Sequence, residues 1–354
     1  MVEKNGSGIS FEGKHFFCGI DVDSKHWDVV VRTASVEVKK ISMDPDPETM
    51  VKYLQRTFPG GIYHTVYEAG YSGFGAHRRL VALGCDSRVT HPADVPTTDK
   101  EKETKSNRVD ARKLARGLEQ GDLKANYVPD DRALYLRTLV RHWDRCVRSG
   151  TRVQQRIKAL LYYYSIDFSR FDKINGPFLA WLETLPLDQG LAKRSLMLHM
   201  EELQQHRARI VAIKRELRQW CRTNDDWELI ELLDTVPGIG FQTAIILYAE
   251  LIDMRRFSSF DQLKSFVGLR PSIHGTGDTV TVKGLTRRRN RHLRYILIEA
   301  AWSALKTDPA LVAYYCACCS RMKKQAAIVM VAKKLLSRIR HVWMHRTPYQ
   351  RSLK

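Results

Sequence analysis

The sequence predicts an α/β domain followed by an all-helical part. Apolar runs of strand length alternate with helical patterns over residues 14–128, which favours a mixed sheet covered by helices. Residues 129–225 carry two long patterns of helical period. Residues 226–345 are helical around one stretch rich in glycine, threonine and proline. We therefore expect three domains with these boundaries: an α/β domain, a long-helix arm and a helical C-terminal domain.

The α/β domain is expected to begin with a β-hairpin. Short runs rich in β-branched and aromatic residues predict its strands, and patterns of helical period predict its helices. The expected strands are 16–22, 27–32, 36–42 and 63–68, and the expected helices are 47–57, 74–83 and 107–119.

The charge of the chain is strongly positive. Lysine and arginine number 58 and acidic residues 39, which leaves a net charge of +19. This excess favours nucleic acid as the partner. A protein of the membrane surface is the alternative, but the sequence has no long apolar run and no lipidation motif. A cytoplasmic protein is expected, because residues 1–13 lack a signal-peptide core.

The seven cysteines do not follow the spacing of a secreted disulfide framework, so reduced thiols are expected. Cys316, Cys318 and Cys319 are close together in an apolar segment of helical character. Zinc would need a second pair of ligands with matching spacing. The sequence offers none, so buried thiols are the favoured interpretation.

Carboxylates stand at two strand ends and on one helix. Asp21 follows the apolar start of the first strand, and Glu68 ends the fourth strand before a glycine-rich turn. Asp110 lies three residues after Asn107, so a helix would place both on one face. Converging carboxylates commonly hold divalent metals, which stabilise the attacking and leaving oxygens of a phosphodiester. The alternative is that these are ordinary surface acids.

The arm carries a heptad pattern from residue 136 to residue 164, which is typical of coiled-coil packing. An intramolecular helical hairpin and a dimerisation arm both explain this pattern. The same helix carries a stripe of arginines about 28 Å long. A stripe of positive charge alone indicates contact with phosphates rather than a face that is merely exposed to solvent. Its predicted nucleic-acid contacts are Arg137, Arg141, Arg145, Arg148 and Arg152, and Arg156 continues it.

The C-terminal domain contains a Pro-Gly-Ile-Gly turn between two helical patterns. Gly238 and Gly240 would permit a tight hairpin whose amides point outward toward a phosphate, as in a helix-hairpin-helix. A purely structural corner between two helices is the alternative. Residues 266–278 are expected to form a loop or a short hairpin. A helix is expected to begin in the segment that follows Thr286, with Thr286 as its N-cap. The start of this helix would face an anion, and its predicted nucleic-acid contacts are Arg287, Arg288, Arg289 and Arg291.

With these segments, the chain resembles the DEDD-type insertion-sequence transposases, the bridge-RNA recombinase family that includes the pilin-gene invertases. The likeness covers nearly the whole chain. The segments 19–21, 105–114 and 127–129 are similar to the RNase H-like (RuvC-like) domain of that family. The segments 236–240, 266–269 and 284–286 are similar to its second conserved domain.

The resemblance implies a metal site built from four acidic positions. Asp21 falls on the first, Glu68 on the second and Asp110 on the fourth. The third position is Asn107, whose amide oxygen can bind Mg²⁺ but contributes no negative charge. We therefore expect Asn107 to bind the metal weakly or to act indirectly.

The resemblance also implies a serine nucleophile in a Ser-Ser-Gly loop. The corresponding residues here are Gly275, Thr276 and Gly277, so the expected nucleophile is the hydroxyl group of Thr276. Ser272 is the alternative if the loop is in a different register.

The expected function is that of a DNA recombinase that moves or inverts a mobile element. The resemblance implies Mg²⁺ or Mn²⁺ as cofactor and strand exchange through a covalent link between protein and phosphate. It also implies a structured guide RNA and a homo-oligomer in which two subunits complete each site. An RNase H-like nuclease or junction resolvase that uses water is one alternative. A nucleic-acid-binding derivative without catalytic activity is the other.

Overall fold

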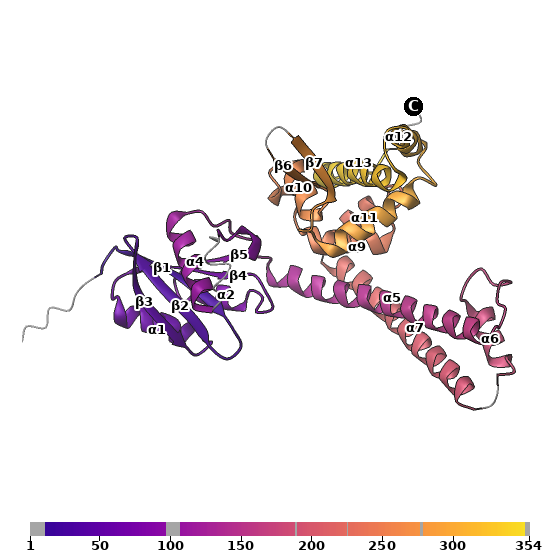
Figure 1. Ribbon diagram of the computed structural model, residues 1–354, viewed down its shortest axis with the longest axis horizontal. Helices are drawn as coiled ribbons and strands as arrows, with labels where there is room; N and C mark the ends of the chain where they lie inside the picture. Colours follow the sequence, from indigo (N-terminus) through magenta and orange to yellow (C-terminus); the bar gives the residue numbers. More distant parts are fainter. Residues whose placement is uncertain (1–10, 97–106, 188–189, 225, 277–278, 351–354) are drawn as a thin grey trace, which may run out of the picture. The chain divides into compact units, whose positions relative to one another are not determined.

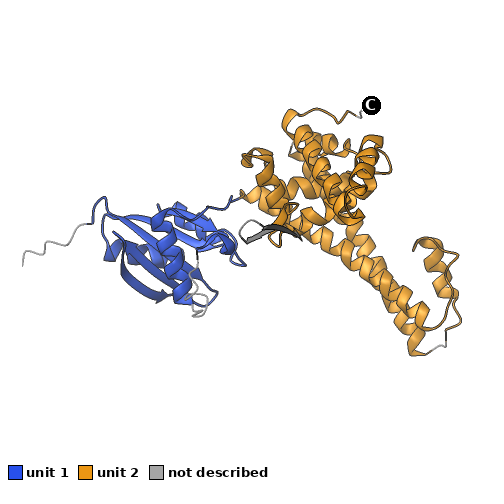
Figure 2. Ribbon diagram, turned by 45° about the horizontal axis from the view of Figure 1, so that its top comes forward, with its two compact units in different colours: residues 1–128 blue, residues 129–354 orange. Residues whose placement is uncertain are grey.

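The N-terminal third folds into a sheet covered by helices, and the remainder is mainly helical (Figure 1). The structure, a computed structural model, describes residues 11–96, 107–187, 190–224, 226–276 and 279–350, and for 273–276 and 279–283 only the backbone. The chain divides into two compact units, Met1–Val128 and Pro129–Lys354, which Figure 2 shows in different colours. Each unit is described by itself.

The sheet of the first unit is mixed, as predicted. Its strand order is β3-β2-β1-β4-β5; β2 is antiparallel to β1 and β3, whereas β4 is parallel to β1 and β5. The strand bounds are β1 (His15–Val22), β2 (Trp27–Thr33), β3 (Val36–Met43), β4 (Ile62–Glu68) and β5 (Asp86–Thr90). The sequence analysis missed β5 because this strand is short and its first residues are polar.

Helices cover both faces of this sheet. The three predicted helices are present as α1 (Pro47–Thr57), α2 (Gly75–Ala82) and α4 (Asn107–Gln120), with the short turn η1 (Pro92–Asp94) between α2 and α4. Leu54 and Leu80 pack with Ile20 on one face of the sheet. On the other face, Ala111 of α4 packs against Val30. The predicted α/β domain is therefore confirmed.

The two long helices of the arm, α5 (Asp131–Tyr163) and α7 (Leu191–Thr223), pack side by side (Figure 1). Val153 and Leu161 of α5 share a core with Leu203 of α7. The intramolecular hairpin therefore explains the heptad pattern. A further helix, α6 (Gly176–Thr184), lies where the sequence indicated only a break, and Asn175 caps its first turn.

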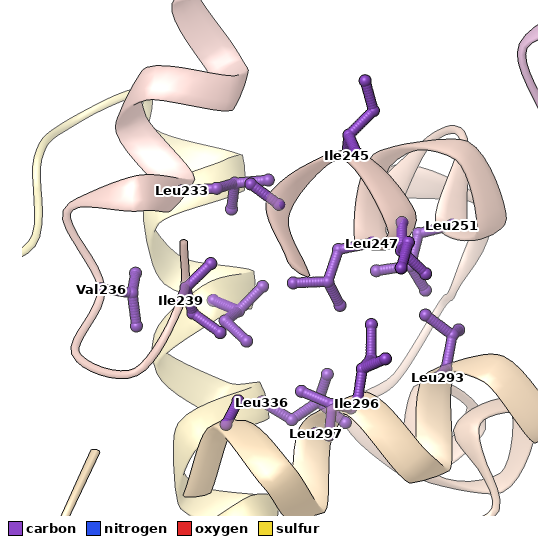
Figure 3. Packing of buried hydrophobic residues seen from close by; sticks show 14 of the residues in the cluster. Leu233, Val236, Ile239, Ile245, Leu247, Leu251, Leu293, Ile296, Leu297 and Leu336 are labelled. Atoms are coloured by element: carbon purple, nitrogen blue, oxygen red, sulfur yellow. The ribbon is translucent and has the colours of Figure 1, made fainter. Parts of the chain in front are cut away.

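The rest of the second unit packs around one large core. Leu233, Ile239, Leu247, Leu297 and Leu336 are fully or almost fully buried within it (Figure 3). Its helices are α8 (Trp227–Asp234), α9 (Phe241–Leu251), α10 (Phe260–Val267), α11 (Arg291–Ala304), α12 (Pro309–Cys319) and α13 (Lys324–His345), with the short turn η2 (Met254–Arg256). The loop or hairpin predicted near residue 275 is the antiparallel pair β6 (Pro271–Thr276) and β7 (Thr279–Leu285).

The cysteine-rich segment forms helix α12, as predicted, but its thiols are not all buried. Cys318 is buried, Cys319 is half-buried and Cys316 is exposed. The prediction was wrong for Cys316 because apolar residues lie all around this helix, and only the side with Leu311 and Cys318 contacts the core. No helix in the described ranges is both long enough and apolar enough to cross a lipid bilayer.

Candidate active site

The carboxyl ends of β1 and β4 bring Asp21 and Glu68 into register. Ile20 is the strand partner of Tyr67, so the next pair along these parallel strands is Asp21 and Glu68. Side chains alternate between the faces of a strand. Both carboxylates therefore project from the face on which α4 packs, because Gly19 in β1 contacts α4.

Helix α4 brings Asp110 to this face. Gly19 permits the close approach, since a Cβ at residue 19 would lie only 2.1 Å from the carbonyl oxygen of Ala111. Asp110 precedes Ala111 in the first turn of α4, and Asn107 is the exposed first residue of that helix. That Asp21, Glu68, Asn107 and Asp110 together form a metal site stays a prediction.

The pKa of Asp21 is raised by burial and by the carboxylates that surround it. Burial raises it above the ordinary value, and the negative charges of Asp110, Asp28 and Asp23 raise it further, against the opposing effect of His26. A carboxylate flanked by like charges favours its protonated form or a bound cation.

Asp28 is a member of this cluster that the sequence analysis missed. It is the strand partner of Asp21, is 7% exposed and lies 3.6 Å from the Arg108 guanidinium. A signal was present, because Asp28 interrupts the apolar run from Trp27 to Val31, where an acidic residue needs a reason to be buried.

Lys113 is the second residue that the sequence analysis missed. Its ammonium group lies 2.8 Å from the Asp110 carboxylate, and its side chain is nearly buried. Within the described residues, no three histidine, cysteine or acidic side chains are close enough together to form a ready ligand set for a metal. The donor chemistry nevertheless fits Mg²⁺ or Mn²⁺, because carboxylate oxygens are the ligands that these ions prefer.

The two candidate nucleophiles belong to the second unit. Thr276 is the last residue of β6 and pairs with Thr279 of β7; its side chain lies outside the described set, as does residue 277. Ser272 lies at the irregularity near the start of the same strand and is half-buried.

The predicted arginine stripe on α5 is divided between tertiary contacts and solvent. Arg141 donates two hydrogen bonds to the buried carboxylate of Glu250 on α9, at 2.6 and 2.9 Å. Arg137 also faces Glu250 and donates to the carbonyl oxygen of Ala249. These two arginines therefore have a structural role, and their phosphate contact stays a prediction. The sequence could not reveal the structural role, because Glu250 lies 109 residues from Arg141.

Farther along the stripe, Arg148 pairs with Asp144 at 2.9 Å and stacks over the ring of Tyr295. Arg145 and Arg152 are both exposed, and Arg152 donates a hydrogen bond to Ser149. Arg145 and Arg152 stay predicted phosphate contacts.

The glycine turn between α8 and α9 packs inward at Gly238. This residue has a positive φ of +80°, and a Cβ there would lie 2.2 Å from the carbonyl oxygen of Ala300 on α11. Its lack of a side chain thus serves close packing, as in the structural-corner alternative. Gly240 is exposed and precedes α9, whose N-terminus has no side-chain cap.

The basic segment before α11 remains exposed. Asn290, and not the predicted Thr286, is the N-cap, since its side chain accepts from the amide of Leu293. Thr286 instead donates its hydroxyl hydrogen to a carbonyl oxygen within the segment. Four guanidinium groups of this segment are exposed: those of Arg287, Arg288, Arg289 and Arg291.

Comparison with known proteins places both units in one family. The model described as Transposase IS116/IS110/IS902 family matches residues 230–316, and the DEDD-type model of IS110, described as Transposase, matches residues 18–166. The protein y4qE of Sinorhizobium fredii is 28% identical over 67% of this chain, which spans 57% of that relative's length. The transposase for insertion sequence element IS1111A of Coxiella burnetii is 26% identical over 82% of this chain and 74% of its own.

The match over residues 18–166 covers α4 and the strands that carry Asp21 and Glu68. The match over residues 230–316 runs from within α8 to within α12 and includes the hairpin of Thr276. The mixed sheet with helices on both faces fits the RNase H-like domain of such enzymes. The chain therefore belongs to the DEDD-type IS110 family of transposases.

Proposed function

We propose that this protein is the transposase of an insertion sequence, which cleaves and rejoins DNA strands. The observation that supports it most directly is the placement of Asp21 and Glu68 at the paired carboxyl ends of β1 and β4, with Asp28 as the strand partner of Asp21. Burial and, after it, the charges of Asp110 and Asp28 raise the pKa of Asp21. In this proposal Asp21, Glu68 and Asp110 hold Mg²⁺ or Mn²⁺, with Asn107 as a weak or indirect participant.

The residues of the proposed site have different roles in the reaction. The bound ion would neutralise charge on the scissile phosphate. Asp21 and Glu68, fixed by neighbouring strands, keep their carboxylate oxygens on one face of the sheet, and Asp110 approaches from α4. Lys113 contacts one carboxylate oxygen of Asp110 at 2.8 Å, which leaves the other oxygen to serve as a ligand of the ion.

The hydroxyl group of Thr276, or of Ser272 in the other register, is the proposed nucleophile. Its oxygen forms a bond to phosphorus, its proton is lost, and the bond from phosphorus to one DNA oxygen breaks to release a DNA hydroxyl group. The reverse attack by a different DNA hydroxyl rejoins the strands and restores the free side chain.

The proposed partners are the two ends of the element, its target DNA and a structured guide RNA. We further propose that the enzyme acts as a homo-oligomer. The exposed arginines from Arg287 to Arg291 support contact with phosphates, because guanidinium groups match phosphate geometry.

The test is incubation of the protein with Mg²⁺, a labelled DNA carrying the element junction, and RNA transcribed from the flanks of the element. Denaturing gels separate cleaved DNA from DNA linked to protein. Asp21→Ala should abolish cleavage while DNA binding persists, and Asp44→Ala, an exposed acid elsewhere in the same unit, should cleave normally. Cleavage by Asp21→Ala at the normal rate would refute the site.

The nucleophile is tested in the same assay. A protein–DNA adduct that disappears in Thr276→Ala but persists in Ser272→Ala would identify Thr276. Cleavage without any adduct would instead support a hydrolytic nuclease. Tight binding with no cleavage would support a derivative without catalytic activity, the alternative that the Lys113–Asp110 ion pair and Asn107 favour.

A further inference from the structure

One face of α7, close to its C-terminal end, forms an open groove of about 590 Å³ that the proposed active site does not use. Its polar lining comes from about three turns of a single helix. The lining side chains that matter here are Lys214, Arg215, Arg218, Gln219, Arg222 and Thr223. Four of these six are cationic, and the other two can donate hydrogen bonds.

Two aromatic rings lie against three of these four cations. The Arg218 guanidinium lies 4.7 Å from the ring centre of Phe241, and the Lys214 ammonium lies 5.9 Å from the same ring. The Arg222 guanidinium lies 4.6 Å from the ring centre of Trp227. Cations that stack on rings are ordered before any ligand binds, so less side-chain entropy is lost on binding.

The charge of the groove is not neutralised within the protein. In the described part of the chain, none of the four cations forms an ion pair, in contrast to Arg137 and Arg141, which face Glu250. Phe241 is also the first residue of α9, whose N-terminus lacks a side-chain cap. The positive end of that helix therefore adds to the field of the groove.

We propose that this groove binds the phosphate backbone of duplex DNA, which rests on the proposed transposase function. Four cationic side chains along one helix face can donate hydrogen bonds to successive phosphates of a strand. The guanidinium group of arginine can donate two parallel hydrogen bonds to the oxygens of one phosphate. Unpaired bases would need open aromatic faces for stacking. The rings of Phe241 and Trp227 are covered by cations, so the groove favours the backbone of a duplex over single strands.

The test is the salt dependence of binding to a labelled duplex DNA of arbitrary sequence, measured by fluorescence anisotropy with the full-length protein. Each lost phosphate contact lowers the slope of log K against log salt by about 0.9. The double variant R215Q/R222Q should therefore lower the slope by about 1.8 and weaken binding at least about tenfold at 0.1 M salt. The variant R215K/R222K, which keeps both charges, should retain most of the slope.

The matched control is R194Q/R209Q, which removes two exposed arginines of the same helix that do not line the groove. It should leave the slope nearly unchanged. Equal slopes for R215Q/R222Q and the wild type would overturn the proposal. The proposal would also be overturned if R215Q/R222Q lost affinity only for a structured RNA or only for single-stranded DNA of the same length.

Different outcomes would refute the groove and the proposed transposase function. If the wild-type protein cleaves junction DNA but R215Q/R222Q keeps its duplex affinity, only the groove is refuted. If the wild type binds no DNA at any salt concentration, the transposase proposal itself is refuted.

Discussion

Gly19 allows β1 and helix α4 to pack closely against each other. We predict that Gly19→Ala impairs both the stability of the first unit and DNA cleavage. An added Cβ would lie 2.1 Å from the carbonyl oxygen of Ala111 and 2.3 Å from the amide nitrogen of Ala115. Both are backbone atoms, so the clash cannot be relieved by rotating a side chain. The helix itself must move.

The size of that movement follows from the geometry. An ordinary contact begins at 3.4 Å, so α4 must withdraw from β1 by about 1.3 Å. Overpacking of this kind costs roughly 1–3 kcal/mol, and the upper end is expected because two backbone atoms are involved. The movement also displaces Asp110 relative to Asp21. A misplacement of about 1 Å at a catalytic site can lower the rate about 100-fold.

Two measurements test this reasoning: hydrogen exchange of peptides from β1 and α4, and cleavage of junction DNA under conditions in which the variant is folded. The control is Gly75→Ala, because nothing lies within 4 Å of a Cβ at residue 75, and alanine favours the start of helix α2. Wild-type protection of α4 in Gly19→Ala would refute the packing argument. Weakened protection with undiminished cleavage would show that Asp110 does not act together with Asp21.

The remaining predictions concern the second unit. Glu250→Gln should lower the free energy of unfolding by about 3 kcal/mol, because it leaves Arg137 and Arg141 without their buried partner; an unchanged urea midpoint would contradict this. Burial raises the pKa of Glu250, but hydrogen bonds from Arg141 and Asn290 and the charge of Arg141 outweigh it and bring the pKa below its ordinary value of 4.5. The stabilisation is therefore present above pH 4.5 and is lost as the pH falls through the lowered pKa, so acid should shift the wild-type midpoint more than that of Glu250→Gln. Leu161→Ala should destabilise the arm by about 2–5 kcal/mol, since Leu161 is fully buried; hydrogen exchange that stays slow in α5 and α7 would disprove it.

Local patterns were sufficient to predict most elements of the fold. The strands that carry Asp21 and Glu68 and the helix that begins at Asn107 follow from side-chain periodicity, which acts within a few residues. Strand β5 lacked such a pattern because it is short and its first three residues, Asp86 to Arg88, are all polar. Its place in the sheet depends on pairing with β4, a contact between segments distant in sequence.

The candidate site was only partly predictable. The sequence indicated Asp21, Glu68 and Asp110, but not that Asp28 would be buried beside Asp21 or that Lys113 would neutralise Asp110. Those two roles depend on strand register and on the side of α4 that faces the sheet. Neither is fixed by the spacing of residues along the chain.

By itself the sequence determined the α/β and helical halves, the acidic positions and the strongly basic character of the protein, because periodicity and composition are local properties. Only the tertiary structure decided which cations are available to a ligand. Arg141 is paired with Glu250, whereas Arg215 and Arg222 lie in an open groove, although all three are arginines on amphipathic helices. The difference arises because a charge is neutralised by whatever the fold brings within a few ångströms of it.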